Sequence, residues 1–139
     1  MIGQTGRICF FRLSENEDLI EAIRRRAEES NVKAGILILI GSLSNVVMGF
    51  YRNGKYELTR LNGPLEIASC MGNIAVDEKG EVIIHSHIVV SNEKCEAFGG
   101  HLMKESHVGV TAELVIIEGS DVELQRAFNK ETKLNLLQL

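Results

Sequence analysis

Apolar residues recur at helical spacing in the stretch between Leu19 and Ala27. Just before this stretch, Ser14 is followed three positions later by Glu17, which is a capping-box pattern. Together these signals predict one main helix over residues 16–30.

Shorter apolar segments elsewhere show the alternation or the continuity that is typical of strands. The continuous, branched run from Ala34 to Ile40 predicts a central strand that is buried on both faces. Further strands are predicted at residues 7–13, 46–51, 55–61, 65–76, 82–91, 98–103, 108–117 and 134–139.

Turn signals separate these predicted strands. The pair Asn53-Gly54 favours a tight hairpin, and the Asn-Gly-Pro sequence at residues 62–64 predicts another turn. A helical turn is expected in the tail that follows Val122. One helix followed by a run of antiparallel strands predicts an α+β fold rather than alternating βαβ units. Another chain often covers the open edges of such a sheet, so an oligomer fits this pattern.

Length and composition fit one globular domain over residues 1–139. The chain is 45% apolar and 24% charged, which is ordinary for a folded protein. No apolar run approaches the ~18–20 residues that span a bilayer, and the first residues lack a signal-peptide pattern. The three cysteines are an odd number at irregular spacing, which argues against a disulfide framework and indicates a cytoplasmic protein.

The charge of the chain does not favour nucleic-acid binding. The net charge is −4, whereas binding to phosphate backbones depends on clustered Lys and Arg. The one basic run is Arg24-Arg25-Arg26, and Glu21, Glu28 and Glu29 surround it on the same predicted helix. This run therefore indicates a solvated helix face with ion pairs more than a nucleic-acid surface.

Three histidines form the strongest candidate for a chemical site. The strand period of two places His85 and His87 on one face of the predicted strand 82–91, with backbones ~6.5–7 Å apart. His101 follows Gly99-Gly100, where the absence of side chains allows a close backbone approach, and it opens the next predicted strand. The three imidazoles can therefore converge on one metal ion.

The chemistry of imidazole narrows the choice of ion. Neutral imidazoles suit Zn²⁺, Ni²⁺ or Fe²⁺ better than Ca²⁺ or Mg²⁺, and three protein ligands leave a position for water. A fourth ligand could come from His107 or Cys95, although neither has a spacing that requires it. The alternative is that His85 and His87 are half-buried strand histidines held by hydrogen bonds.

Five short segments follow one another along the chain: Gly41-Ser42-Leu43-Ser44-Asn45-Val46, Gly63-Pro64-Leu65-Glu66-Ile67, His85-Ser86-His87, Gly99-Gly100-His101-Leu102 and Thr111-Ala112-Glu113. In their order and spacing, and over nearly the whole chain, they resemble the PPC domain (plants and prokaryotes conserved, also called DUF296).

This resemblance implies a domain with one main helix on a mostly antiparallel, strongly curved sheet, assembled as a homotrimer. The histidines of the prokaryotic relatives form a metal site, which carries over onto His85, His87 and His101. The implied fold also resembles that of acetolactate decarboxylase, an enzyme that holds a metal with three histidines. Plant members carry AT-hook motifs for DNA binding, but this chain has no Arg-Gly-Arg-Pro sequence and no basic tail.

Two strand glutamates are weaker candidates. Glu66 or Glu113 could orient a histidine ligand or act as a general acid or base, and Glu113 is the better catalytic candidate. A structural role is favoured for both. Three functions then remain: a homotrimeric zinc-binding module with a binding or regulatory role, a metal-dependent lyase or hydrolase acting on a small oxygenated substrate, and a DNA-associated protein.

Overall fold

The structure, a computed structural model, describes residues 1–138. These residues form one helix and eight strands: β1 (Gln4–Ser14), α1 (Leu19–Glu29), β2 (Gly35–Arg52), β3 (Lys55–Val76), β4 (Val82–Ser91), β5 (Ala97–Leu102), β6 (His107–Ser120), β7 (Gln125–Asn129) and β8 (Leu134–Gln138). All the strands join one sheet in the order β1-β6-β2-β5-β4-β3-β7-β8, with β2 also paired to β3. Its pairings are antiparallel except that between β3 and β7. The predicted α+β class is therefore confirmed.

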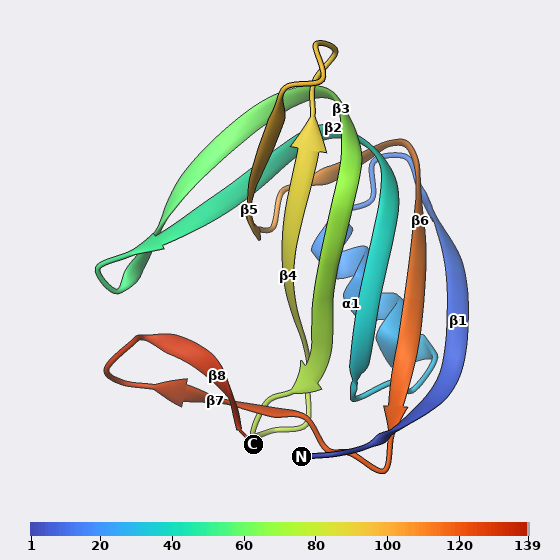
Figure 1. Cartoon of the computed structure of the whole chain (residues 1–139), viewed down its shortest axis with the longest axis vertical. Coiled ribbons are helices and arrows are strands. Elements are labelled where there is room, and N and C mark those ends of the chain that lie inside the picture. The colour runs from blue at the N-terminus through green and yellow to red at the C-terminus, as the bar shows by residue number, and fades with distance from the viewer. Residues whose placement is uncertain (139) are drawn as a thin grey trace.

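Two bulges make the sheet curl on itself (Figure 1). The pairing of β2 with β3 shifts register between Leu39 and Gly41, and again between Leu43 and Asn45. Gly41 has a φ of +137°, a conformation that favours glycine. Beyond these bulges, the second half of β2 pairs with β5 at Gly49 and His101.

The turn predicted at residues 62–64 is wrong, whereas the Asn53-Gly54 hairpin is confirmed by the pairing of Arg52 with Lys55. Residues 62–64 lie inside β3, because Gly63 and Pro64 form a bulge opposite Ser44. The two strands remain paired on both sides of this bulge, which is where a sheet tolerates proline.

The helix α1 begins later than predicted. Its N-cap is Asp18, whose side chain accepts the backbone N–H three residues further on. The Ser14–Glu17 contact does form, with the Glu17 carboxylate accepting the Ser14 N–H. It lies before the helix, because Asn16 has a φ of 67° and so cannot be helical. Among the described residues, no helix has the length and apolar character needed to cross a bilayer.

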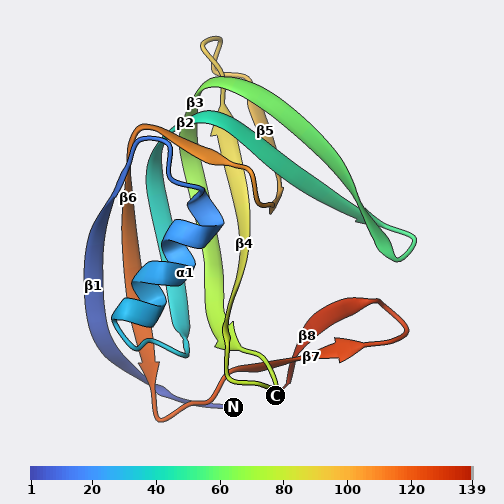
Figure 2. The ribbon, with the colours of Figure 1, turned by 180° about the vertical axis from the view of Figure 1, so that it is seen from behind.

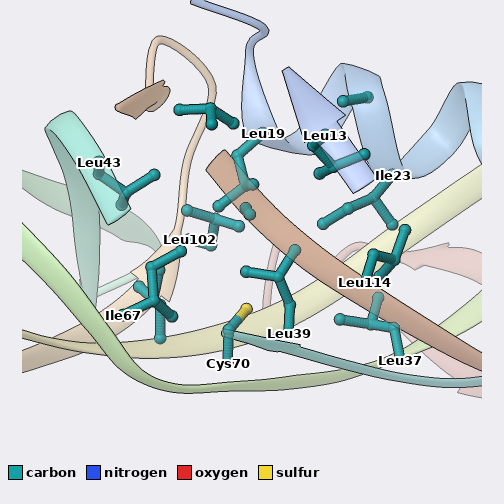
Figure 3. Packing of buried hydrophobic residues seen from close by; sticks show 14 of the residues in the cluster. Leu13, Leu19, Ile23, Leu37, Leu39, Leu43, Ile67, Cys70, Leu102 and Leu114 are labelled. Carbon is teal, nitrogen blue, oxygen red and sulfur yellow. The ribbon is translucent and has the colours of Figure 1, made fainter. Parts of the chain in front are cut away.

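The hydrophobic core fills the space between α1 and the concave face of the sheet (Figures 2 and 3). Leu19 and Ile23 of the helix are fully buried there, and Leu37, Leu39 and Leu114 of the central strands belong to the same cluster. This packing holds β2 and β6 rigidly in the middle of the sheet.

The opposite, convex face is apolar but exposed, and the prediction of a central strand buried on both faces is wrong for the single chain. Ile36, Ile38 and Ile40 of β2 are 50%, 39% and 53% exposed, and Phe10 of β1 is 76% exposed. The helix covers one face of the sheet only. We call the surface formed by these four residues and Met71 the outer face.

The C-terminal tail forms a hairpin, β7–β8, in place of the predicted helical turn. The predicted last strand is β8 as far as Gln138, and Leu139 lies outside the described residues. This hairpin and the end of the β2–β3 hairpin project on the same side of the sheet (Figures 1 and 2). They meet where the Tyr51 hydroxyl donates to the carbonyl oxygen of Thr132, at 2.5 Å.

Candidate metal centre

The structure brings His85, His87 and His101 together, as the strand pattern predicted. His85 and His87 lie two residues apart on β4, and His101 on β5 is paired directly opposite His87. One nitrogen from each ring lies within 4.8 Å of the others, and the ring centroids are 5.1 to 5.5 Å apart. Three nitrogens this close can ligate one ion.

The local sequence explains this convergence. Ser86 points into the core between the two β4 histidines, so both imidazoles project from the other face. Gly100 lets β5 approach β2 closely, because a Cβ there would lie 3.1 Å from the carbonyl oxygen of Gly49. The close approach expected for the Gly-Gly-His segment is therefore present.

Two further side chains hold the histidine rings, and sequence reasoning identified neither. Arg126 of β7 donates from Nη2 to Nδ1 of His85, at 2.9 Å. The hydroxyl of Tyr56 lies 3.4 Å from Nδ1 of His101, and the two rings stack with centroids 4.7 Å apart. Both residues come from the projecting hairpins, so only the folded chain brings them to the cluster.

The environment favours the neutral form of two of the imidazoles, those of His85 and His101. Burial lowers the pKa of His101 to about 4, with additional repulsion from the other two histidines and Arg126. Burial, then the charge of Arg126, also lowers the pKa of His85. Neutral imidazole is the form that binds metals, so protons compete only weakly with a divalent transition metal for His85 and His101 at neutral pH.

An open hollow of about 310 Å³ adjoins the cluster. Its walls come from β4, β5 and the two projecting hairpins, and its lining residues are Tyr56, Ile83, Ile84, His85, His101, Arg126, Lys133, Leu134, Asn135 and Leu136. No Asp or Glu of the described chain lines it.

The other predicted residues lie elsewhere. His107 is hydrogen-bonded to Asn45, with 3.0 Å between Nδ1 and Oδ1, and Cys95 is exposed in a loop. Neither belongs to the three-histidine cluster. Glu66 is exposed on β3, opposite Ser91 of β4.

Glu113 is also separate from the cluster within one chain. It is exposed on β6, paired with Arg12 and Ile40. Strands β2 and β3 stand between β6 and β4 at this level, which is a separation of roughly 14 Å at ~4.8 Å per strand. A catalytic role for Glu113 stays a prediction.

The fold and the site together define a class of protein. Its members are single-helix α+β domains with a strongly curved sheet and a cluster of three imidazoles. The chain belongs to the Plants and Prokaryotes Conserved (PCC) domain family, which residues 2–120 match. This is the family whose motifs the sequence resembles.

Two archaeal crystal structures are similar over the whole chain. The metal-containing protein from Archaeoglobus fulgidus is 28% identical, with a TM-score of 0.89, and the match covers 99% of this chain and 97% of that one. The plant- and prokaryote-conserved protein from Pyrococcus horikoshii is 27% identical, with a TM-score of 0.90, and the match covers 99% and 95%.

A curated relative is much longer. The bifunctional protein GlmU from Synechococcus sp. strain JA-2-3B'a(2-13) is 28% identical over 121 residues, which are 86% of this chain and 18% of GlmU. The chain therefore spans less than a fifth of this relative.

Less similar structures share the fold. A candidate DNA-binding protein from Ralstonia eutropha JMP134 is 24% identical with a TM-score of 0.82, over 94% of this chain and 90% of that one. A Staphylococcus aureus protein of unknown function, similar to alpha-acetolactate decarboxylase, is 12% identical with a TM-score of 0.53. That match covers 84% of this chain and 54% of the other.

Proposed function

We propose that the protein is a homotrimeric metal-binding module in which His85, His87 and His101 hold one divalent transition metal, with zinc the first choice. The observation that carries this proposal is the approach of three imidazole nitrogens to within 4.8 Å of one another. The lowered pKa values of His85 and His101 support it, because protons compete weakly for these rings. A similar archaeal protein is described as metal-containing.

The number of ligands favours an open site over a structural one. Structural zinc sites usually have four protein ligands, whereas three leave a coordination position for a small molecule. The adjoining hollow gives such a molecule access. A binding or regulatory role for this position is the function that the geometry supports best.

A metal-dependent lyase or hydrolase is the second candidate, favoured by the same open position. A bound ion of this kind supplies Lewis acidity toward an oxygen atom of a substrate. The side chains that could move a proton in the hollow are Tyr56 and Lys133. Burial raises the pKa of Tyr56, so its hydroxyl stays protonated at neutral pH. This makes the hollow better suited to binding than to base catalysis.

A DNA-associated role has weaker support. It comes from the description of a similar Ralstonia eutropha protein. The net charge is −4, and Arg24, Arg25 and Arg26 all form ion pairs with glutamates of the same chain. The one basic run of the sequence is therefore already paired within the chain, which weakens its ability to contact phosphates.

The trimer is supported by the outer face. Phe10, Ile36, Ile38, Ile40 and Met71 are all at least 39% exposed on one side of the sheet. Contiguous apolar surface of this kind marks an interface in soluble proteins. Association through it would also cover the isoleucines that the sequence pattern predicted to be buried.

Metal analysis of the purified protein tests the proposed site. Wild-type protein loaded with zinc and desalted should retain one ion per chain, and a His85→Ala/His87→Ala double variant should retain none. A His107→Ala variant is the matched control and should bind like wild type, because His107 lies outside the cluster. Equal zinc content in wild type and double variant would refute the site.

A further inference from the structure

We propose that the ligand of the three-histidine site is a small organic carboxylate, and that Arg126 is the residue that anchors it. The inference rests on the proposed metal site and goes further, since it assigns the ligand class and a residue that no family motif contains. Arg126 lies beyond residues 2–120, the part that matches the family.

Arg126 is a buried cation without an anionic partner. Only 7% of its surface is exposed to solvent. Its hydrogen-bond acceptors are neutral: Oδ1 of Asn73 at 2.9 Å, the carbonyl oxygen of Asn135 at 2.8 Å and Nδ1 of His85. No Asp or Glu among the described residues forms an ion pair with it. Buried charges in proteins are normally paired, because desolvation of an unpaired charge is costly.

The guanidinium of Arg126 also has hydrogen-bond donors that are not used. It carries five N–H groups, of which two on Nη2 and one on Nη1 are used. Its Nε is buried and has no hydrogen-bond partner. Arg126 therefore lines the hollow with hydrogen-bonding capacity that the chain itself does not satisfy, and an acceptor in the hollow would reach it once the guanidinium moves off His85.

Metal binding would free one more donor of Arg126. A neutral imidazole has one nitrogen with a lone pair, and the other nitrogen carries its proton. The Arg126 bond uses the Nδ1 lone pair of His85. A metal ion on Nδ1 would need that same lone pair, and a metal ion on Nε2 would leave the proton on Nδ1, which could then no longer accept from Arg126. The Arg126–His85 bond and ligation by a neutral His85 therefore exclude each other.

The freed guanidinium would then lie beside a divalent cation, where only an anion can offset the repulsion between the two charges. The planar donors of arginine match the two oxygens of a carboxylate. A carboxylate that contacts the metal and Arg126 together would satisfy both groups.

The rest of the hollow indicates an organic anion. Apolar residues line it beside the charged groups, namely Ile83, Leu134 and Leu136. Its volume of about 310 Å³ suits a molecule of a few carbon atoms rather than a bare inorganic ion. Lys133 adds a second positive charge at the wall.

The test uses linkage between the two ligands. If a carboxylate binds metal and Arg126 together, it must raise zinc affinity by the same factor by which zinc raises carboxylate affinity. Zinc affinity is measured by competition with a fluorescent chelator, at constant ionic strength, with isobutyrate as the probe. Isobutyramide, which has the same shape without the charge, is the control ligand, and inorganic phosphate is the competing anion.

For wild type we expect isobutyrate to tighten zinc binding about 5-fold or more, within the usual range of coupling, and isobutyramide to have no effect. An Arg126→Met variant should bind zinc at least as tightly as wild type without anion, and should show no response to isobutyrate. A Lys133→Met variant should keep most of the response. An Arg126→Lys variant retains the positive charge and serves as a second variant if Arg126→Met does not fold. Its zinc affinity should respond more weakly to isobutyrate than that of wild type.

Three results would overturn the inference. The first is zinc binding by wild type that isobutyrate does not change, which is also the result expected if a second copy of the chain supplies the missing carboxylate. The second is an equal response in Arg126→Met. The third is a larger response to phosphate than to isobutyrate, which would make the ligand inorganic. Absence of zinc binding in wild type would instead refute the proposed metal site itself, and the inference with it.

Discussion

The Arg7–Glu118 pair shows how a single contact sets part of the pH dependence of stability. Glu118 accepts hydrogen bonds from the backbone and the side chain of Arg7, and these bonds lower its pKa from 4.5 to about 2. In the unfolded chain the Glu118 carboxylate takes up a proton near pH 4.5, whereas in the native chain it does so only near pH 2. The stabilisation is therefore complete above pH 4.5 and is lost as pH falls toward 2.

Replacing Glu118 with Gln removes this contribution. We expect the variant to lose stability relative to wild type at neutral pH, and the difference between the two proteins to shrink between pH 4.5 and 2. Urea unfolding midpoints measured across that range check this. Glu15→Gln is the control, because Glu15 is exposed and outside the ion pairs described. A difference that does not change with pH would contradict the assignment.

The residues of the site divide into those that local sequence predicts and those that it cannot. His85 and His87 follow from the strand period, and His101 follows from the glycines before it. Arg126 and Tyr56 carry no local signal, because an isolated arginine or tyrosine in a polar hairpin is common. Their roles arise from contacts between segments 41 and 45 positions apart in the chain.

Strands were predicted well where side-chain alternation was regular and less well where bulges interrupt it. The strand β4 was predicted with its observed limits. The strands β2 and β3 were each divided in two. In β3 the bulge at Gly63-Pro64 has the composition of a turn, and in β2 the small and polar residues at 41–45 interrupt the apolar run where the register shifts. The strand β7 was missed, since its short polar sequence has no alternation, and it pairs with β3 at one position only, Val76 with Gln125.

The contact between β3 and β4 beside the histidines gives a prediction about both stability and site. Gly72 is paired with Ser86, and a Cβ at this position would overlap the carbonyl oxygen of His85. Gly72→Ala should therefore destabilise the fold by about 1–3 kcal/mol, the usual cost of overpacking, and should weaken zinc binding by displacing His85.

Chemical denaturation and zinc titration check this prediction. Ser69→Ala on the same strand is the control, because Ser69 is exposed, and its effect should stay within about 0.5 kcal/mol. A Gly72→Ala protein as stable as wild type would mean that the two strands can separate without cost.

The proposed trimer would account for the apolar residues on the convex side of the sheet. The sequence pattern of residues 34–40 is typical of a strand that is buried on both faces, whereas the single chain buries it on one face only. The prediction of burial on both faces is therefore wrong for one chain, and in the proposed trimer the same residues would be covered by a neighbouring copy.

Light scattering tests the assembly. Wild type should have about three times the chain mass of 15.4 kDa, and Ile38→Glu should reduce this to the mass of one chain, because a charge in an apolar interface is costly. Phe128→Glu is the control; Phe128 is 61% exposed, but it lies on β7, away from the outer face. A wild-type protein with the mass of one chain at micromolar concentration would contradict the proposed trimer.

The weak attachment of the β7–β8 hairpin has a consequence for how such proteins diversify. Its backbone pairs with the main sheet at one position, and its residues lie outside the family match. Mutations there can change the wall of the hollow while the core and the three histidines stay intact. Under the proposed function, exposed positions of this hairpin could therefore change the ligand preference with little penalty to folding. A fragment trimmed at residue 120 would keep the histidines of β4 and β5 but lose Arg126, the residue by which we expect relatives to differ in what they bind.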